Sequence, residues 1–302
     1  MTGTLRIGTR GSALALWQAR TVAALLEARG HPTELVTIKT DGDRLQEAVL
    51  SQSGGKGLFV KEIEDALLAR TIDLAVHSAK DMSVTLPDGL GVAAVLPRED
   101  SRDVLVFKPG RTALGDAPAI GTSSVRRSAQ LTARFPGARF LPVRGNVDTR
   151  LRKVDEGEYD ALVLAAAGLK RLGLGGRISE LLSHDDCIPA PGQGIVAIET
   201  RADADGTRAA VEALNDPAAF AAFTAERAVV AALGGGCQLP LGAIAVFEGD
   251  ALAMQAIVIS PDGRRRIVRR GTGEASRPAE LGRRIAAELA KAGAIAILAE
   301  VR

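Results

Sequence analysis

Cations and hydroxyl groups follow five of the strands that the sequence predicts, and such side chains bind carboxylate or phosphate. Guanidinium groups bind both anions in a bidentate manner, and the first turn of a helix offers free backbone N–H groups. In α/β sheets, the carboxyl ends of the strands are also where ligands bind. The sequence therefore indicates a site for a polyanion. The residues concerned are Arg10, Ser12, Lys80, Ser124, Arg126, Arg127, Arg144, Lys170 and Arg171.

Basic residues are concentrated between Gly121 and Lys153, where Asp148 is the only acid. The whole chain has a formal net charge of only +2, so this is a local enrichment. For the arginines at strand ends an anion site is the better interpretation; these are Arg126, Arg127 and Arg144. For the others we expect a solvated basic face; these are Arg134, Arg139, Arg152 and Lys153.

Asp81 differs from the other acids because it directly follows a predicted strand and lies beside Lys80. A carboxylate in that place can stabilise a cationic intermediate or transfer protons. It can equally be a helix N-cap or the partner of a salt bridge. The residues alone leave both interpretations open.

No metal or nucleotide site is expected. The three histidines are dispersed, and His184, which lies near Cys187, is interpreted as structural. The stretch GGKG at 54–57 lacks the spacing of a phosphate-binding loop, and within the polar segment 41–57 it indicates a mobile functional loop. The other cysteine, Cys237, follows three glycines in GGGCQLP, which allow a flexible backbone. Its sulfur is therefore expected either to carry an attached group or to act as a nucleophile.

The composition limits the class of protein. Of the 302 residues, 46% are hydrophobic and only 3% are aromatic, so nucleic-acid binding by aromatic stacking is not expected. Two cysteines fit a reducing compartment better than a disulfide framework. The N-terminus does not read as a signal peptide, and the apolar runs are too short for a membrane span. We expect a cytoplasmic protein.

The elements that must position these residues alternate between strand and helix, which predicts α/β domains. We expect domain 1 at 1–97 and 195–215, domain 2 at 98–194, and a small α+β domain 3 at 216–302 with a three-stranded antiparallel sheet. Strands are predicted at 5–9, 34–40, 73–78, 102–107, 118–123, 138–143, 161–165 and 194–201. Helices are predicted from Ser12 to Gly30 and at 59–70, 125–135, 147–157, 219–233 and 278–293.

Many segments together resemble the porphobilinogen deaminases, also called hydroxymethylbilane synthases. They occur in the family's order from Leu5 to about Gly242. The C-terminal segment matches the family in its pattern more than in its individual residues. The agreement of so many motifs in order is specific to this family. The main ones are RIGTRGSALALWQA, GGKGLFVKEIEDALL, DLAVHSAKD, GTSSVRRSAQL, RGNVDTRL, PAPGQGIVAIE and GGGCQLP.

The resemblance implies two doubly wound domains like those of type II periplasmic binding proteins around a cleft, plus the small third domain. It implies a monomeric transferase that joins four porphobilinogen molecules into hydroxymethylbilane and releases ammonia, for haem and other tetrapyrroles. The family's covalent dipyrromethane cofactor is held by a thioether, which here implies Cys237, and the family's catalytic aspartate is Asp81.

The remaining site residues are also carried over by motif. The resemblance implies that the cofactor contacts are Lys80, Ser124, Arg126, Arg127, Arg144 and Gly145. It implies that the substrate contacts are Arg10, Ser12, Gln18, Arg150 and Arg171, and that Lys56 and Phe59 belong to a mobile active-site loop. The chain departs from the pattern at Gln52, where many relatives have lysine, and at Ser83, where the family often has proline.

Two other classes of protein fit part of the sequence. A solute-binding module would have two α/β units around a cleft, but it would need neither Cys237 nor Asp81 and would usually carry a secretion signal. A nucleic-acid binder could use the basic stretch, but the near-neutral charge and the few aromatics weigh against it. Neither a nucleic acid nor a membrane is therefore an expected partner.

Overall fold

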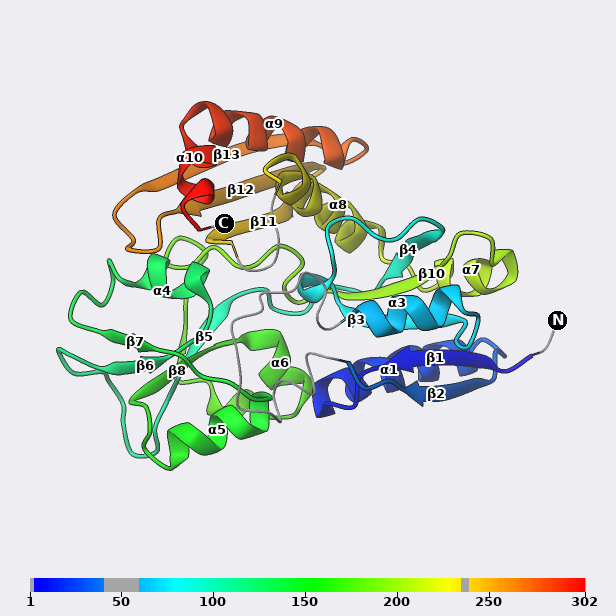
Figure 1. Ribbon diagram of the computed structural model, residues 1–302, viewed down its shortest axis with the longest axis horizontal. Helices are drawn as coiled ribbons and strands as arrows, with labels where there is room; N and C mark the ends of the chain where they lie inside the picture. The colour runs from blue at the N-terminus through cyan, green and yellow to red at the C-terminus, as the bar shows by residue number, and fades with distance from the viewer. Residues whose placement is uncertain (1–2, 41–59, 235–238, 302) are drawn as a thin grey trace. The chain divides into compact units, whose positions relative to one another are not determined.

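Two five-stranded sheets and one three-stranded sheet organise the part of the chain that the computed structural model describes, residues 3–40, 60–234 and 239–301 (Figure 1). The chain divides into unit 1, Met1–Arg98 with Ile195–Phe220, and unit 2, Glu99–Gly194 with Ala221–Arg302. The chain thus leaves unit 1 after its first part and later returns to it. The separation of a third domain from residue 216 onward stays a prediction.

The sheet of unit 1 has the strand order β2-β1-β3-β10-β4. Strands β1, β2 and β3 are parallel, and β10 runs antiparallel between β3 and β4. The strands are β1 (Leu5–Thr9), β2 (Thr33–Thr37), β3 (Leu74–Ser78), β4 (Leu90–Val95) and β10 (Val196–Arg201). The helices are α1 (Ala13–Glu27), α3 (Lys61–Leu68), α7 (Asp205–Glu212) and the 3₁₀ turn η1 (Ala79–Asp81).

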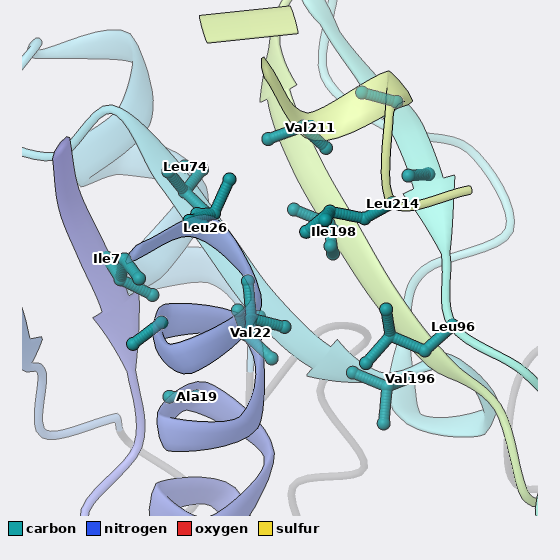
Figure 2. Packing of buried hydrophobic residues seen from close by; sticks show 14 of the residues in the cluster. Ile7, Ala19, Val22, Leu26, Leu74, Leu96, Val196, Ile198, Val211 and Leu214 are labelled. Atoms are coloured by element: carbon teal, nitrogen blue, oxygen red, sulfur yellow. The ribbon is translucent and has the colours of Figure 1, made fainter. Parts of the chain in front are cut away.

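Helices cover both faces of this sheet. Residues of α1 and α7, such as Leu26 and Val211, pack on Leu74 and Ile198 (Figure 2). On the other face, α3 contributes Ile63 and Leu67 to a cluster with Ile72 and Ala75. Each fully buried Leu or Ile side chain stabilises the fold by roughly 1.5–3 kcal/mol, so these two clusters fix the sheet between its helices.

The sheet of unit 2 has the order β7-β6-β8-β5-β9. Strands β6, β7 and β8 are parallel, and β5 is antiparallel to β8 and β9. The strands are β5 (Asp103–Phe107), β6 (Ala119–Gly121), β7 (Arg139–Leu141), β8 (Ala161–Ala165) and β9 (Glu180–Leu181). The helices are α4 (Val125–Leu131), α5 (Val147–Asp155), α6 (Ala166–Arg171) and the 3₁₀ turn η2 (Gly175–Arg177).

This sheet too is covered on both faces. Leu151 of α5 and Leu169 of α6 pack with Leu162 on one face. On the other face, Leu131 of α4 packs with Leu105. The two five-stranded sheets therefore have the same arrangement, three parallel strands followed by one antiparallel strand and an edge strand.

The C-terminal part of unit 2 contains an antiparallel sheet of β11 (Leu241–Glu248), β12 (Ala251–Ile259) and β13 (Arg266–Glu274). Helices α9 (Pro278–Lys291) and α10 (Ala294–Ala299) pack on it. Ile257 and Ile259 of β12 also pack with Ala129 of α4. The long helix α8 (Pro217–Ala232) begins within unit 1 and continues into unit 2.

The α/β fold and the antiparallel three-stranded sheet are confirmed. The strand expected at 34–40 ends earlier, at Thr37, and the helix expected at 59–70 is described as Lys61–Leu68. Strand β4, the helices α6, α7 and α10 and the two-residue strand β9 were not predicted, since each of them is short. The functional loop expected at 41–57 lies outside the described residues.

Candidate functional site

Unit 1 brings its predicted site residues to the carboxyl ends of β1 and β3. Arg10 follows β1, and Ser12 is the N-cap of α1, where its Oγ accepts a hydrogen bond of 3.3 Å from the Ala15 N–H. Lys80 and Asp81 form η1 directly after β3. Because β1 and β3 are parallel neighbours, these two strand ends lie at one edge of the sheet.

Gln18 connects α1 to this edge. Its side chain is buried, and Nε2 donates a 2.9 Å hydrogen bond to Oγ of Ser78, the last residue of β3. The next residue, Ala79, donates its backbone N–H to the Ile195 carbonyl at 3.0 Å. Gln18, carried over as a substrate contact, therefore also holds the strand end from which Asp81 extends.

Asp81 is half-buried on the short turn η1. Its carboxylate makes no hydrogen bond or ion pair with any residue in the described part of the chain. The turn is closed by a hydrogen bond of 3.3 Å from the Met82 N–H to the Ala79 carbonyl. The carboxylate is thus held on a defined backbone, and its oxygens are not occupied by other described residues.

A buried histidine–glutamate pair joins β3 to β10, and it was not predicted from the sequence. Nε2 of His77 lies 3.0 Å from Oε2 of Glu199, and the side chains are 4% and 0% exposed. Burial and the nearby Glu199 raise the pKa of Glu64, which lies on α3. The sequence gives a weak signal for the pair, since both residues stand in otherwise apolar strands.

Unit 2 places its predicted residues at the corresponding edge, after β6, β7 and β8. Ser124 is at the N-cap position of α4, and its backbone N–H donates a hydrogen bond of 3.2 Å to Oγ1 of Thr122. Oγ of Ser123 bonds both to the Val143 carbonyl and to the Val143 N–H, at 2.8 and 3.0 Å. These bonds join the loop after β6 to the loop after β7.

Arg126 and Arg127 are buried in the first turn of α4, and both form ion pairs with Asp103. Asp103 is the first residue of β5, and it pairs with Ala165 because β5 is antiparallel to β8. Although burial opposes ionisation, the two guanidinium groups hold the pKa of the Asp103 carboxyl well below its usual range. The sequence alone does not indicate this internal counter-ion, because Asp103 lies more than twenty residues before the two arginines.

The loop after β7 is shaped by Gly145. Its φ is +109°, and a Cβ at this position would lie 2.6 Å from Cγ2 of Thr149, so a larger residue would be strained. Arg150 donates from Nε to the Gly145 carbonyl at 2.8 Å. Arg144 is exposed, and no hydrogen bond or ion pair joins it to another described residue.

Arg171 lies at the end of α6, and its Nη2 donates to the Gly194 carbonyl at 2.7 Å. Burial lowers its pKa, although Glu99 opposes the shift. The neighbouring Lys170 binds Asp100 at 3.0 Å and Glu99 at 3.5 Å. Of these two strand-end cations, Lys170 is paired with acids and Arg171 is bonded to a backbone carbonyl.

Three of the predicted site residues, Cys237, Lys56 and Phe59, lie outside the described residues, as does Gln52. His184 binds Ser101 at 3.0 Å, in line with its structural interpretation. Within residues 3–40, 60–234 and 239–301, no group of three or more His, Cys, Asp or Glu side chains could hold a metal ion. No helix in those ranges has the length and apolar character needed to span a membrane.

The fold and these two edges define an α/β protein with cations at its strand ends. Residues 5–209 match the family model described as "Porphobilinogen deaminase, dipyromethane cofactor binding domain", and residues 220–291 match "Porphobilinogen deaminase, C-terminal domain". The chain therefore belongs to the porphobilinogen deaminase family, as its motifs predicted. It carries the domain with which that family binds its dipyrromethane cofactor.

Curated relatives match along the whole chain. Porphobilinogen deaminase of Roseiflexus castenholzii is 50% identical over 306 residues, which cover 99% of this chain and 100% of that protein. Porphobilinogen deaminase of Acidithiobacillus ferrooxidans is 48% identical over 307 residues, covering 100% and 99%. Identity of this extent covers both units and the C-terminal sheet.

Likenesses to solved structures are weaker. The L-cystine solute receptor of Neisseria gonorrhoeae is 16% identical, with a TM-score of 0.41 over 70% of this chain and 85% of that one. The periplasmic aliphatic sulphonate binding protein of Escherichia coli is 14% identical, with a TM-score of 0.41 over 76% and 70%.

Proposed function

We propose that this chain joins four porphobilinogen molecules into hydroxymethylbilane and releases ammonia, using a dipyrromethane primer attached to Cys237. The observation that carries the proposal is that each five-stranded sheet brings its predicted residues to its carboxyl strand ends, Asp81 in unit 1 and the buried arginines in unit 2. Family membership over the whole chain supports it. Cytoplasmic location, a monomeric state and the absence of nucleic-acid or membrane partners belong to the same proposal.

The strand-end cations suit a substrate with several carboxylates. Each porphobilinogen carries an acetate and a propionate, so a growing chain accumulates negative charge at every addition. Arginine forks bind carboxylates with two parallel N–H···O bonds, which fix orientation as well as charge. We assign Arg10, Ser12, Gln18, Arg150 and Arg171 to the substrate, and by motif we assign Lys56 and Phe59 to the family's active-site loop.

Asp81 is assigned the proton and charge chemistry. Loss of ammonia from porphobilinogen and the following carbon–carbon bond formation both pass through positively charged pyrroles. A fixed carboxylate stabilises that charge more in the transition state than in the ground state, and it can accept the proton that leaves. Its place on η1, at a strand end and without an internal partner among the described residues, suits this role.

The residues of unit 2 fit the dipyrromethane group. Arg127 uses three of its five N–H groups internally, so two remain for the cofactor's carboxylates. Gly145 keeps the loop after β7 free of a side chain. We assign Ser124, Arg126, Arg127, Arg144 and Gly145 of unit 2 to the group, and by motif also Lys80 of unit 1. When bound, the group supplies the free pyrrole position to which the first substrate is joined.

Intact-mass measurement tests the attachment. Wild-type protein should exceed the mass of the bare polypeptide by that of a dipyrromethane, and it should give a colour with Ehrlich's reagent for pyrroles. The Cys237→Ser variant should show neither, whereas the matched Cys187→Ser variant should show both, because Cys187 is completely buried. A wild-type mass equal to that of the bare chain after incubation with porphobilinogen would refute the proposal.

A further inference from the structure

We propose that Asp103 is a positioning residue for the cofactor site, because it fixes Arg126 and Arg127 as one rigid pair of carboxylate-binding groups. The proposal rests on the proposed function, and it adds a residue that contacts neither cofactor nor substrate. The supporting observation is a set of buried contacts within unit 2 that converge on the two carboxylate oxygens of Asp103.

The two oxygens of Asp103 are divided between the arginines. Oδ2 accepts from Arg126 Nη1 at 2.8 Å, and Oδ1 accepts from Arg127 Nε and Nη2 at 3.0 and 2.6 Å. The carboxylate is 0% exposed, and the arginine side chains are 5% and 8% exposed. Water therefore competes little for these bonds, and each arginine is held by a different oxygen.

Further contacts fix the same groups from behind. Gln193 Nε2 donates to Oδ1 at 2.9 Å, and the Cys187 thiol donates to Oδ2 at 3.3 Å. Arg126 Nη1 also donates to the Ile188 carbonyl at 2.7 Å, and Arg127 Nη1 to the Val163 carbonyl at 3.0 Å. Each guanidinium plane thus has at least two fixed acceptors, which leave it little freedom to rotate.

Donors remain on both arginines for an external anion. No described residue accepts from Nε or Nη2 of Arg126, and Arg127 keeps one N–H on each Nη. With Asp103 ionised and Cys187 protonated, the two arginines and the aspartate carry a net charge of +1. The cluster can therefore accept one carboxylate and become neutral.

The sign of one substitution separates positioning from simple charge. Asp103→Asn raises the net charge of the cluster from +1 to +2, so charge alone would strengthen the binding of an anion. If Asp103 instead positions the arginines, the variant frees them to separate and turn, and binding weakens. The two accounts predict opposite changes in the same measurement.

The experiment follows the loading of the cofactor by mass. Full-length apo-protein, made in cells that cannot form porphobilinogen, is incubated with porphobilinogen well below the unfolding temperature of every variant, and the mass increase is followed. Asp103→Asn should load at least about tenfold more slowly than wild type, the effect of losing one charge-assisted hydrogen bond. Asp160→Asn is the control, because it removes the charge of a half-buried carboxylate at the other end of β8. It should load at the wild-type rate.

A double variant tests whether Asp103 acts through the arginines. If it does, Asp103→Asn combined with Arg127→Lys should load no more slowly than the slower of the two single variants. Multiplied effects of the two changes would overturn the proposal, and so would loading by Asp103→Asn at or above the wild-type rate. A purely structural role would lower stability without this non-additivity.

A milder pair of variants decides the matter if Asp103→Asn does not fold. Cys187→Ser keeps an O–H that can donate to Asp103, whereas Cys187→Ala removes the donor. Positioning predicts loading near the wild-type rate for serine and about threefold slower loading for alanine, the effect of losing one neutral hydrogen bond. Equal rates, or faster loading by the alanine variant, would contradict the proposal. Failure of the wild-type protein to load at all would instead refute the proposed function.

Discussion

The two five-stranded sheets share one arrangement of parallel and antiparallel strands, yet the aspartates at their corresponding edges are in opposite situations. Asp81 in unit 1 is half-buried on a 3₁₀ turn, and its oxygens bind no other described residue. Asp103 in unit 2 lies within a strand, is completely buried and binds two arginines. Aspartates at corresponding edges of the two sheets therefore differ: the carboxylate of Asp81 is available to a ligand, whereas that of Asp103 is occupied by two arginines.

The neighbouring strand explains this difference. Both sheets have an antiparallel strand beside the third parallel one, which brings the start of that strand to the site edge. In unit 2 this start is Asp103, which pairs with Ala165. In unit 1 it is Val196, which pairs with Ser78, so the corresponding place there is apolar. A counter-ion for buried cations exists only in the second case.

The largest expected effect concerns Asp81. Asp81→Asn keeps the shape of the side chain but removes its charge and its ability to accept a proton, so turnover should fall by about 10²- to 10⁴-fold. Its unfolding midpoint in urea should stay close to that of wild type. Asp88→Asn, a nearby exposed aspartate, is the control and should keep full activity. Residual turnover above a tenth of wild type would remove the contrast between the two aspartates.

The second effect concerns Arg127. Arg127→Leu leaves the buried carboxylate of Asp103 with one guanidinium partner, and loss of one member of a buried ion pair costs about 3–5 kcal/mol. Urea unfolding should show this loss in the apo-protein, and cofactor loading should stop. Arg139→Leu, an exposed arginine of the same basic stretch, should change stability by less than about 0.5 kcal/mol. Equal effects of the two changes would contradict the internal role of Arg127.

Much of this arrangement could be predicted from the sequence, because strand ends follow from hydrophobic pattern and the polar residues directly after them are visible. Ser12 as an N-cap and the strand LRIGT before it are examples. The edge residues of unit 1 and unit 2 were named in this way. The residues alone, however, predict only a site for an anion. The identity of the substrate was predicted only from the family motifs.

The partners of buried charges could not be predicted, because they come from strands far apart in the chain. Asp103 precedes Arg126 by more than twenty residues, and Glu199 follows His77 by more than a hundred. Periodicity shows that a strand is buried, but it does not show which polar residue on a neighbouring strand lies opposite. From the sequence, Arg126 and Arg127 are therefore expected to bind only a ligand, and the carboxylate that joins them is not predicted.

A smaller effect is expected at Gln18, where the two roles of one residue can be separated. Gln18→Leu removes the donor to Ser78 Oγ in a buried place, which should destabilise the protein by about 1–3 kcal/mol. If Gln18 only contacts substrate, KM should rise with no change in the unfolding midpoint. Arg20→Ala, an exposed position of the same helix, should alter neither quantity.

The smallest effect concerns Cys187, whose burial beside Asp103 is tested by the reactivity of its thiol. Burial, reinforced by the Asp103 carboxylate, raises the pKa of the Cys187 thiol from 9.0 to about 12. Between these values the folded protein keeps a proton that the unfolded chain loses, so this contribution to stability is present below about pH 9 and is lost as the pH rises toward about 12. In the Cys237→Ser protein Cys187 is the only thiol, and iodoacetamide should therefore leave the folded protein unmodified at pH 9 while alkylating it in urea. If the folded thiol reacts as fast as the unfolded one, Cys187 and its neighbour Asp103 are accessible to solvent, and the contrast between Asp103 and Asp81 is lost.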